Sequence, residues 1–63
     1  MDQQPKEQKP FGVGFEVKPG SGMERTVRLL IGEQAWREGG GWDNRVYWTR
    51  NARGVWVVAE VRP

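Results

Sequence analysis

The sequence predicts an all-β domain in which four antiparallel strands form a meander that curls toward a small barrel. Apolar and polar residues alternate with the period of two that a half-buried strand requires, first in residues 11–18 and again in residues 23–31. A second pair of strands is joined by turn residues at 51–54. The predicted domain covers residues 10–63, and its strands are expected near 11–18, 23–31, 44–50 and 55–62.

Length and composition limit how this domain can be stabilised. A chain of 63 residues buries only ~60% of the surface that its unfolded form exposes. It has no cysteine and no histidine, which excludes disulfides and the zinc sites built on those ligands. Dense aromatic packing or self-association must then stabilise it, and four tryptophans favour the packing. Few side chains suit a nucleophilic triad, so we expect no enzymatic activity, no cofactor and no metal.

The N-terminal residues 1–9 are polar and have no apolar residue after Met1, so they predict a disordered tail. Its composition is not that of a signal peptide. The longest apolar run, Val55 to Ala59, is far shorter than the ~20 residues that span a bilayer. We therefore expect a cytoplasmic protein without a membrane partner.

The middle of the chain predicts a hairpin followed by an irregular segment. "PGSG" at residues 19–22 supplies turn residues between the first two predicted strands. Residues 33–38 are compatible with one helical turn or with a loop. A run of three glycines at 39–41 is expected to end that segment, because glycine loses much backbone entropy inside a regular element.

The last predicted hairpin has a recognisable turn sequence, "NARG", which predicts a three-residue loop with a bulge. Asn51 suits the first turn position, and Gly54 tolerates the positive φ that the loop requires. With Asn51 opposite Val55, one face is expected to form the core: Tyr47, Thr49, Val55, Val57, Ala59 and Val61. The opposite face, which we expect to be partly solvated, carries Val46, Trp48, Arg50, Trp56, Val58 and Glu60. The pairs that follow are Arg50–Trp56, Thr49–Val57, Trp48–Val58, Tyr47–Ala59 and Val46–Glu60.

The positive charge of the chain lies in its last segment. The formal net charge is +2, and four arginines against two acidic residues in 41–63 account for all of it. Every cation after residue 18 is arginine, which stacks on aromatic rings and pairs with phosphates in ways that lysine does not.

Aromatic and arginine side chains of the last hairpin, centred on Trp48, Arg50 and Trp56 of the partly solvated face, are the first candidate site. Its members are Trp48, Arg50, Trp56, Tyr47, Arg45 and Arg53. Such a platform can stack bases, at ~1–3 kcal/mol per base, or bind a protein partner. The alternative is that the tryptophans complete a second small core over the strand glycines Gly12 and Gly14.

A second candidate site is the glycine-rich segment, in which Trp36, Arg37 and Trp42 flank flexible backbone. These residues could close over a ligand, or the two tryptophans could plug the open ends of a barrel.

These features predict a small non-enzymatic protein that binds nucleic acid, with single strands favoured. The alternative is a protein-interaction module, such as a small regulator or inhibitor that docks on a larger enzyme. In size the domain is similar to SH3-like and OB-like barrels, an analogy of fold that says little about function. An unclosed sheet would also leave edges that can pair with a second copy of the chain.

Overall fold

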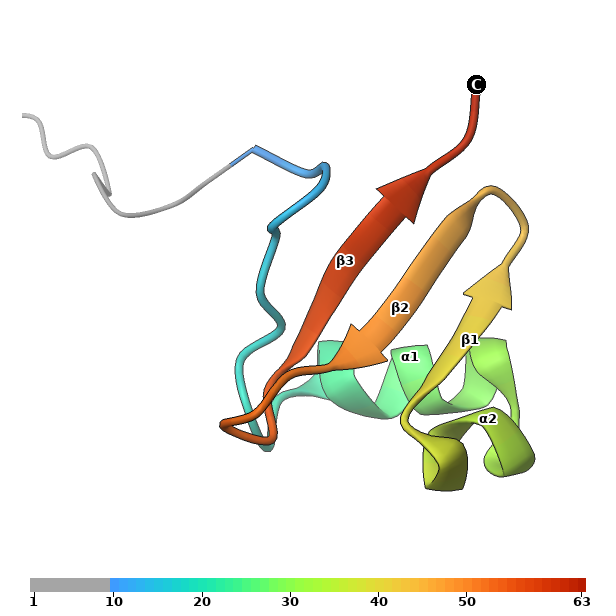
Figure 1. The fold of residues 1–63 in the computed structure, drawn as a ribbon. Coiled ribbons are helices and arrows are strands. Elements are labelled where there is room, and N and C mark those ends of the chain that lie inside the picture. The colour runs from blue at the N-terminus through green and yellow to red at the C-terminus, as the bar shows by residue number, and fades with distance from the viewer. Residues whose placement is uncertain (1–9) are drawn as a thin grey trace, which may run out of the picture.

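The computed structural model describes residues 10–63 and contains both helices and strands. Helices α1 (Gly22–Ile31) and α2 (Glu33–Glu38) precede strands β1 (Gly40–Asp43), β2 (Val46–Arg50) and β3 (Trp56–Val61). The strands form an antiparallel sheet in the order β1-β2-β3, and the helices lie behind its lower half (Figure 1). The prediction of an all-β, four-stranded meander curling into an SH3/OB-like barrel is therefore wrong, because the described residues form two helices and an open sheet of three strands. The predicted tail at 1–9 lies outside the described residues.

Helix α1 occupies the segment that was predicted as a strand over residues 23–31. Met23, Val27 and Ile31 are four residues apart, so they line one face of a helix as well as one face of a strand. Ser21 decides between the two, because its side chain caps the helix and accepts a hydrogen bond from the Glu24 backbone N–H at 3.2 Å. The Glu24 carboxylate in turn accepts from the Gly20 N–H at 2.9 Å. This Ser-x-x-Glu spacing is the signal that the period-two interpretation missed.

The glycine run ends α2 and then enters the sheet. Gly39 has a left-handed φ of 91° and donates its N–H to the Ala35 carbonyl at 2.9 Å. Gly40 and Gly41 belong to β1, so the expectation that all three glycines lie outside a regular element is wrong. A Cβ on Gly41 would collide with the Cβ of Ala35. The bare backbone therefore lets α2 pack directly against β1.

The N-terminal segment, predicted as a strand over residues 11–18, follows β3 without forming a regular strand (Figure 1). Gly14 donates to the Val58 carbonyl at 2.8 Å, and Val17 donates to that of Trp56 at 2.8 Å. Only Glu16 forms a bridge, with Val57. The φ of 95° at Gly14 breaks the extended geometry that a regular strand would need.

The last hairpin confirms the predicted turn and the first part of its register. Asn51 donates its backbone N–H to the Val55 carbonyl at 2.9 Å, and its side-chain oxygen accepts from the N–H groups of Arg53 and Val55. Gly54 has a φ of 81°.

Strand β3 carries a bulge that the sequence interpretation missed. The pairs Arg50–Trp56, Thr49–Val57 and Trp48–Val58 are as predicted, but Tyr47 pairs with Glu60 and Val46 with Val61. Ala59 is therefore the extra residue of a bulge, and the predicted pairs Tyr47–Ala59 and Val46–Glu60 are wrong.

The core lies on the opposite side of the sheet from the one expected. The buried apolar residues are Val17, Val27, Trp48, Trp56 and Val58. Three of them belong to the face that was expected to be partly solvated, and α1 and α2 cover it. The predicted core face is left uncovered by the helices. Two indoles offer more apolar area than the valines opposite, which favours burying their side.

Truncating Trp56 should unfold the protein. Its side chain is 1% exposed, so Trp56→Ala opens a cavity and should cost about 3–5 kcal/mol, as should Trp48→Ala. Urea midpoints measure this cost. Leu29→Ala is the control, because Leu29 is 82% exposed and its change should stay within about 0.5 kcal/mol. A midpoint for Trp56→Ala near that of the control would show that the ring lies outside the core.

Gly54 should be the least replaceable residue of the last turn. Gly54→Val should lower the free energy of unfolding by about 1–2 kcal/mol, because a Cβ is strained at this φ. Gly54→Asn should be milder, since asparagine tolerates the left-handed region. Gly22→Ala is the matched control: that glycine has an ordinary φ and open space around it. Equal losses for Val and Asn would reject the turn geometry.

Candidate functional site

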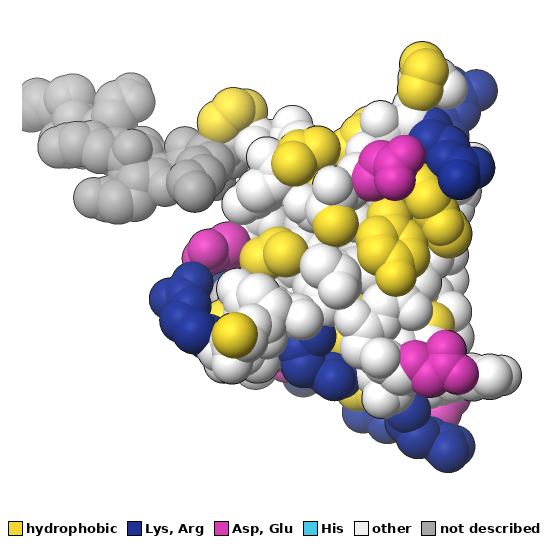
Figure 2. Space-filling view, viewed as in Figure 1, with side chains coloured by type: hydrophobic (Ala, Val, Ile, Leu, Met, Phe, Trp, Pro, Cys, Tyr) yellow, Lys and Arg dark blue, Asp and Glu magenta, His cyan; other side chains and the backbone are white. Residues whose placement is uncertain are grey.

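The face of the sheet turned away from the helices, here called the open face, carries a compact aromatic patch. Strand pairing places Trp42 of β1 opposite Tyr47 of β2, and Tyr47 opposite Glu60 of β3. Figure 2 shows this face, with hydrophobic side chains gathered over β1 and β2 and charged side chains beside them. It is the part of the sheet that remains accessible to a ligand.

Tyr47 lies against Gly40, whose lack of a side chain leaves room for the hydroxyl end of the tyrosine ring. A Cβ on Gly40 would collide with the Tyr47 hydroxyl and lie 3.2 Å from its ring carbon Cζ. The Tyr47 ring therefore covers the bare backbone of Gly40. Trp42 packs beside it, with ring centroids 5.1 Å apart and planes inclined by 53°. The two rings form a rigid, stepped aromatic surface.

Arg62 lies over the Trp42 ring and adds a cation to the patch. Its guanidinium carbon is 3.9 Å from the Trp42 ring centroid, the shortest of the cation–π contacts in residues 10–63. Its Nε lies 4.0 Å from Oε2 of Glu60. Its backbone N–H donates to the Arg45 carbonyl at 2.8 Å, which fixes the end of the chain to the β1–β2 turn.

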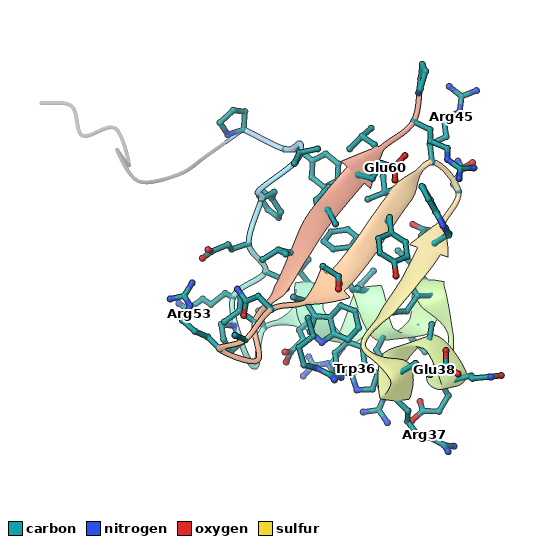
Figure 3. The ribbon with its side chains drawn as sticks, in the orientation of Figure 1. Trp36, Arg37, Glu38, Arg45, Arg53 and Glu60 are labelled. Atoms are coloured by element: carbon teal, nitrogen blue, oxygen red, sulfur yellow. The ribbon has the colours of Figure 1, made fainter. Side chains whose placement is uncertain are left out.

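Arg45 provides a second cation at the rim of the open face. It follows Asn44, whose φ of 57° suits a tight two-residue turn between β1 and β2. Within residues 10–63 the Arg45 side chain makes no hydrogen bond and no ion pair. Figure 3 shows Arg45 and Glu60 at the same end of the sheet.

Three of the predicted site residues thus meet on the open face: Trp42, Arg45 and Tyr47. Trp48 and Trp56 do not join them, because their side chains are 3% and 1% exposed and form the core. The structure therefore corrects the expectation of an accessible platform built on these two rings. The rings are structural, but they belong to the main core and not to a second small core over Gly12 and Gly14, where an added Cβ would meet no atom within 4 Å.

Arg50 and Trp36 belong to a stacked cluster on the helix side. The rings of Trp36 and Trp56 are parallel within 12° with centroids 4.5 Å apart. Arg50 lies 4.8 Å over Trp56 and donates from Nη2 to the Trp36 carbonyl at 2.7 Å. Arg28 lies 5.4 Å over the ring of Trp36. These contacts fasten α2 to the hairpin and are structural.

The remaining two candidates lie at other places on the surface. Arg53 in the last turn pairs with Glu16 at 3.1 Å, which ties the turn to the N-terminal segment. Arg37 is exposed on α2, away from the open face (Figure 3).

The sequence interpretation missed Arg62 as a site residue and placed Trp42 in a loop. The "WDNRVY" stretch held a usable signal, because a two-residue turn over Asn44 and Arg45 sets Trp42 opposite Tyr47. The position of Arg62 depends on the bulge at Ala59, which no pattern in the sequence predicted.

Comparison with known proteins gives no further guide: the chain matches no protein-family model, no curated protein and no solved structure. Within residues 10–63, no helix has the length and apolar content needed to cross a membrane. The same residues contain no group of three or more acidic, histidine or cysteine side chains arranged to hold a metal ion.

The ion pair between the two helices should be visible in a pH titration. Arg28 donates to Glu33 through Nε at 3.0 Å and through Nη2. These hydrogen bonds, more than the charge of Arg28, lower the pKa of Glu33, and desolvation opposes the change. Because the folded pKa is depressed, the stabilisation is present above the ordinary carboxyl pKa and is lost as pH falls through the lowered value.

Carbon-detected NMR of the Glu33 carboxyl measures this directly. We expect a titration midpoint below the ordinary glutamate value in the native chain and a return toward that value in Arg28→Gln, which removes the charge and the fork of donors. An unchanged midpoint in Arg28→Gln would show that the pair does not persist in solution.

Proposed function

We propose that the protein is a small non-enzymatic binding module whose open face binds single-stranded nucleic acid. The observation that supports this most is the adjacency of Trp42 and Tyr47 on the one uncovered sheet face, with Arg62 stacked on Trp42. Sheet faces with exposed aromatic rings can stack unpaired bases, whatever their sequence.

The charges around the rings suit a phosphate backbone. Arg45 and Arg62 lie at the same end of the face and are joined through their backbones, and Glu60 offsets one of the two charges. Arginine offers the planar fork of donors that phosphate accepts. A modest local excess of positive charge supports weak or transient binding of a few nucleotides rather than tight binding of a long strand.

The shape of the patch favours single strands over duplex. Stacking on Tyr47 or Trp42 requires a base whose flat surface is free, and in a duplex those surfaces are covered by neighbouring pairs. The two rings, inclined by 53° on the face of the sheet, do not form a protruding ridge of the kind that enters a groove of duplex nucleic acid.

Binding of a labelled oligothymidine of about 12 nucleotides, a length within the usual site sizes, tests the proposal by fluorescence anisotropy. Tyr47→Ala and Trp42→Ala should each weaken binding by about 1–3 kcal/mol, because each removes one stacking ring. Two phosphate contacts predict a loss of about sevenfold between 50 and 200 mM salt.

Two arginine variants form a matched test and control. Arg45→Ala should weaken binding and flatten the salt dependence, whereas Arg25→Ala removes the same charge from an exposed position on α1 and should change neither. Absence of oligonucleotide binding at low salt, or equal losses in the two arginine variants, would contradict the proposal. The open face would then be assigned to a protein partner, for which rings and arginines are also typical.

A further inference from the structure

One edge strand of the sheet is hydrogen-bonded on its outer side within residues 10–63, and the other is not. The outer edge of β3 is covered, because the N-terminal segment exchanges hydrogen bonds with it: Gly14 and Val17 donate to β3, and Val58 donates to the Phe15 carbonyl at 3.0 Å. The other edge is β1, which pairs only with β2 within residues 10–63. A row of backbone groups is therefore left open on one side of the molecule.

The register shows which groups of β1 face outward. Arg50 donates its N–H to the Gly39 carbonyl at 3.0 Å, so Gly40–Thr49 is a non-hydrogen-bonded pair of the antiparallel ladder. Gly41 and Asp43 then direct their N–H and C=O groups to β2. Gly40 and Trp42 direct theirs away from the sheet, at the spacing that a further strand requires.

The edge lacks several of the devices that usually block strand addition. Its residues, Gly40 to Asp43, include no lysine, no proline and no bulge; the short length of the strand and the charge of Asp43 limit strand addition to a short segment that complements that charge. The one large side chain, Trp42, lies over the open face rather than across the edge, because it packs on Tyr47.

We propose that this β1 edge receives an extended peptide segment of a partner protein, which adds a fourth antiparallel or parallel strand to the sheet. Main-chain bonds to Gly40 and Trp42 would supply affinity, and alternate side chains would supply specificity. The site is centred on backbone groups at the edge, whereas the proposed nucleic-acid surface is centred on ring faces, and the two adjoin at Trp42 and Tyr47.

The surroundings of the edge define the peptide. On the open face its side chains would lie against Trp42 and beside the Tyr47 ring, which favours branched apolar or aromatic residues. On the helix side, strand alternation places Asp43, and the exposed Glu38 lies at the end of α2 beside the start of β1 (Figure 3). Two carboxylates there favour lysine or arginine in the alternate positions.

A second copy of the chain fits this edge less well than a peptide. Two-fold pairing of β1 with β1 would place both α2 helices on the same side of the joined sheet. Ala35 already packs against the backbone of Gly41, directly under the edge. A second copy would therefore bring its own helix to the joined edge, whereas an extended peptide brings no helix with it.

The probe is a synthetic library of peptides about eight residues long in which Val, Ile or Phe alternates with Lys or Arg, long enough to pair with a strand. A second library replaces Lys and Arg by Glu and Asp. We expect the basic library to yield binders and the acidic library to yield fewer and weaker ones. The best binder is then measured by fluorescence anisotropy.

Chemical synthesis provides a matched pair of proteins. N-methylglycine at position 40 removes one outward N–H without adding a side chain, and it should weaken the peptide at least tenfold. N-methylglycine at position 22 modifies the first residue of α1, whose N–H has no partner within the helix, and should leave binding unchanged. In the native chain, bound peptide should slow amide exchange at Gly40 and Trp42 more than at Gly41 and Asp43.

Three results would overturn the proposal. One is that neither library yields a binder. Another is that a bound peptide protects other amides and binds equally to both N-methylated proteins. The third is that the native chain alone dimerises in sedimentation and protects Gly40 and Trp42 without peptide, which would assign the edge to a second copy.

Discussion

Burial of Trp48 and Trp56 on one side of a small sheet is the constraint on which the rest of the structure depends. The described residues hold five buried apolar side chains, and these two are the largest. The sequence has no cysteine that could share the task of stabilisation. The helices supply the cover: Val27 of α1 enters the core, and Trp36 of α2 stacks on Trp56. Once that side is closed, Tyr47 and Trp42 on the opposite side are left for solvent or a ligand.

Two adjacent glycines connect the core to the open face and to the β1 edge. Gly41 lets α2 approach β1 from the helix side, and Gly40 lets the Tyr47 ring lie on the open face. A side chain at either position would push one layer away from the sheet. The same four-residue strand therefore holds the second helix, seats the aromatic patch and leaves an edge with open hydrogen-bonding groups. The absence of side chains at Gly40 and Gly41 thus determines how closely Tyr47 and α2 approach the two sides of this strand.

Sequence reasoning succeeded where local chemistry decides structure and failed where two periodicities coincide. The turn at Asn51 and Gly54 was predictable, since a side-chain acceptor and a positive φ are both encoded locally. Met23, Val27 and Ile31 fit a strand and a helix equally, and only the cap at Ser21 separates the two. Of the site, Tyr47 and Arg45 were named as candidates, although Tyr47 was expected on the core face. Trp42 was assigned to a loop because of the glycine run that precedes it.

The bulge at Ala59 explains why the composition of the open face could not be read from the sequence. In a regular ladder Ala59 would oppose Tyr47, and Glu60 would face the helices. The extra residue reverses the alternation, so that Glu60 and, two residues later, Arg62 come to the open face. Arg62 then reaches the Trp42 ring, and its N–H reaches the Arg45 carbonyl. One inserted residue in β3 thus adds the cation Arg62 to a patch that would otherwise have only Arg45 at its rim, and the proposed phosphate contacts depend on both.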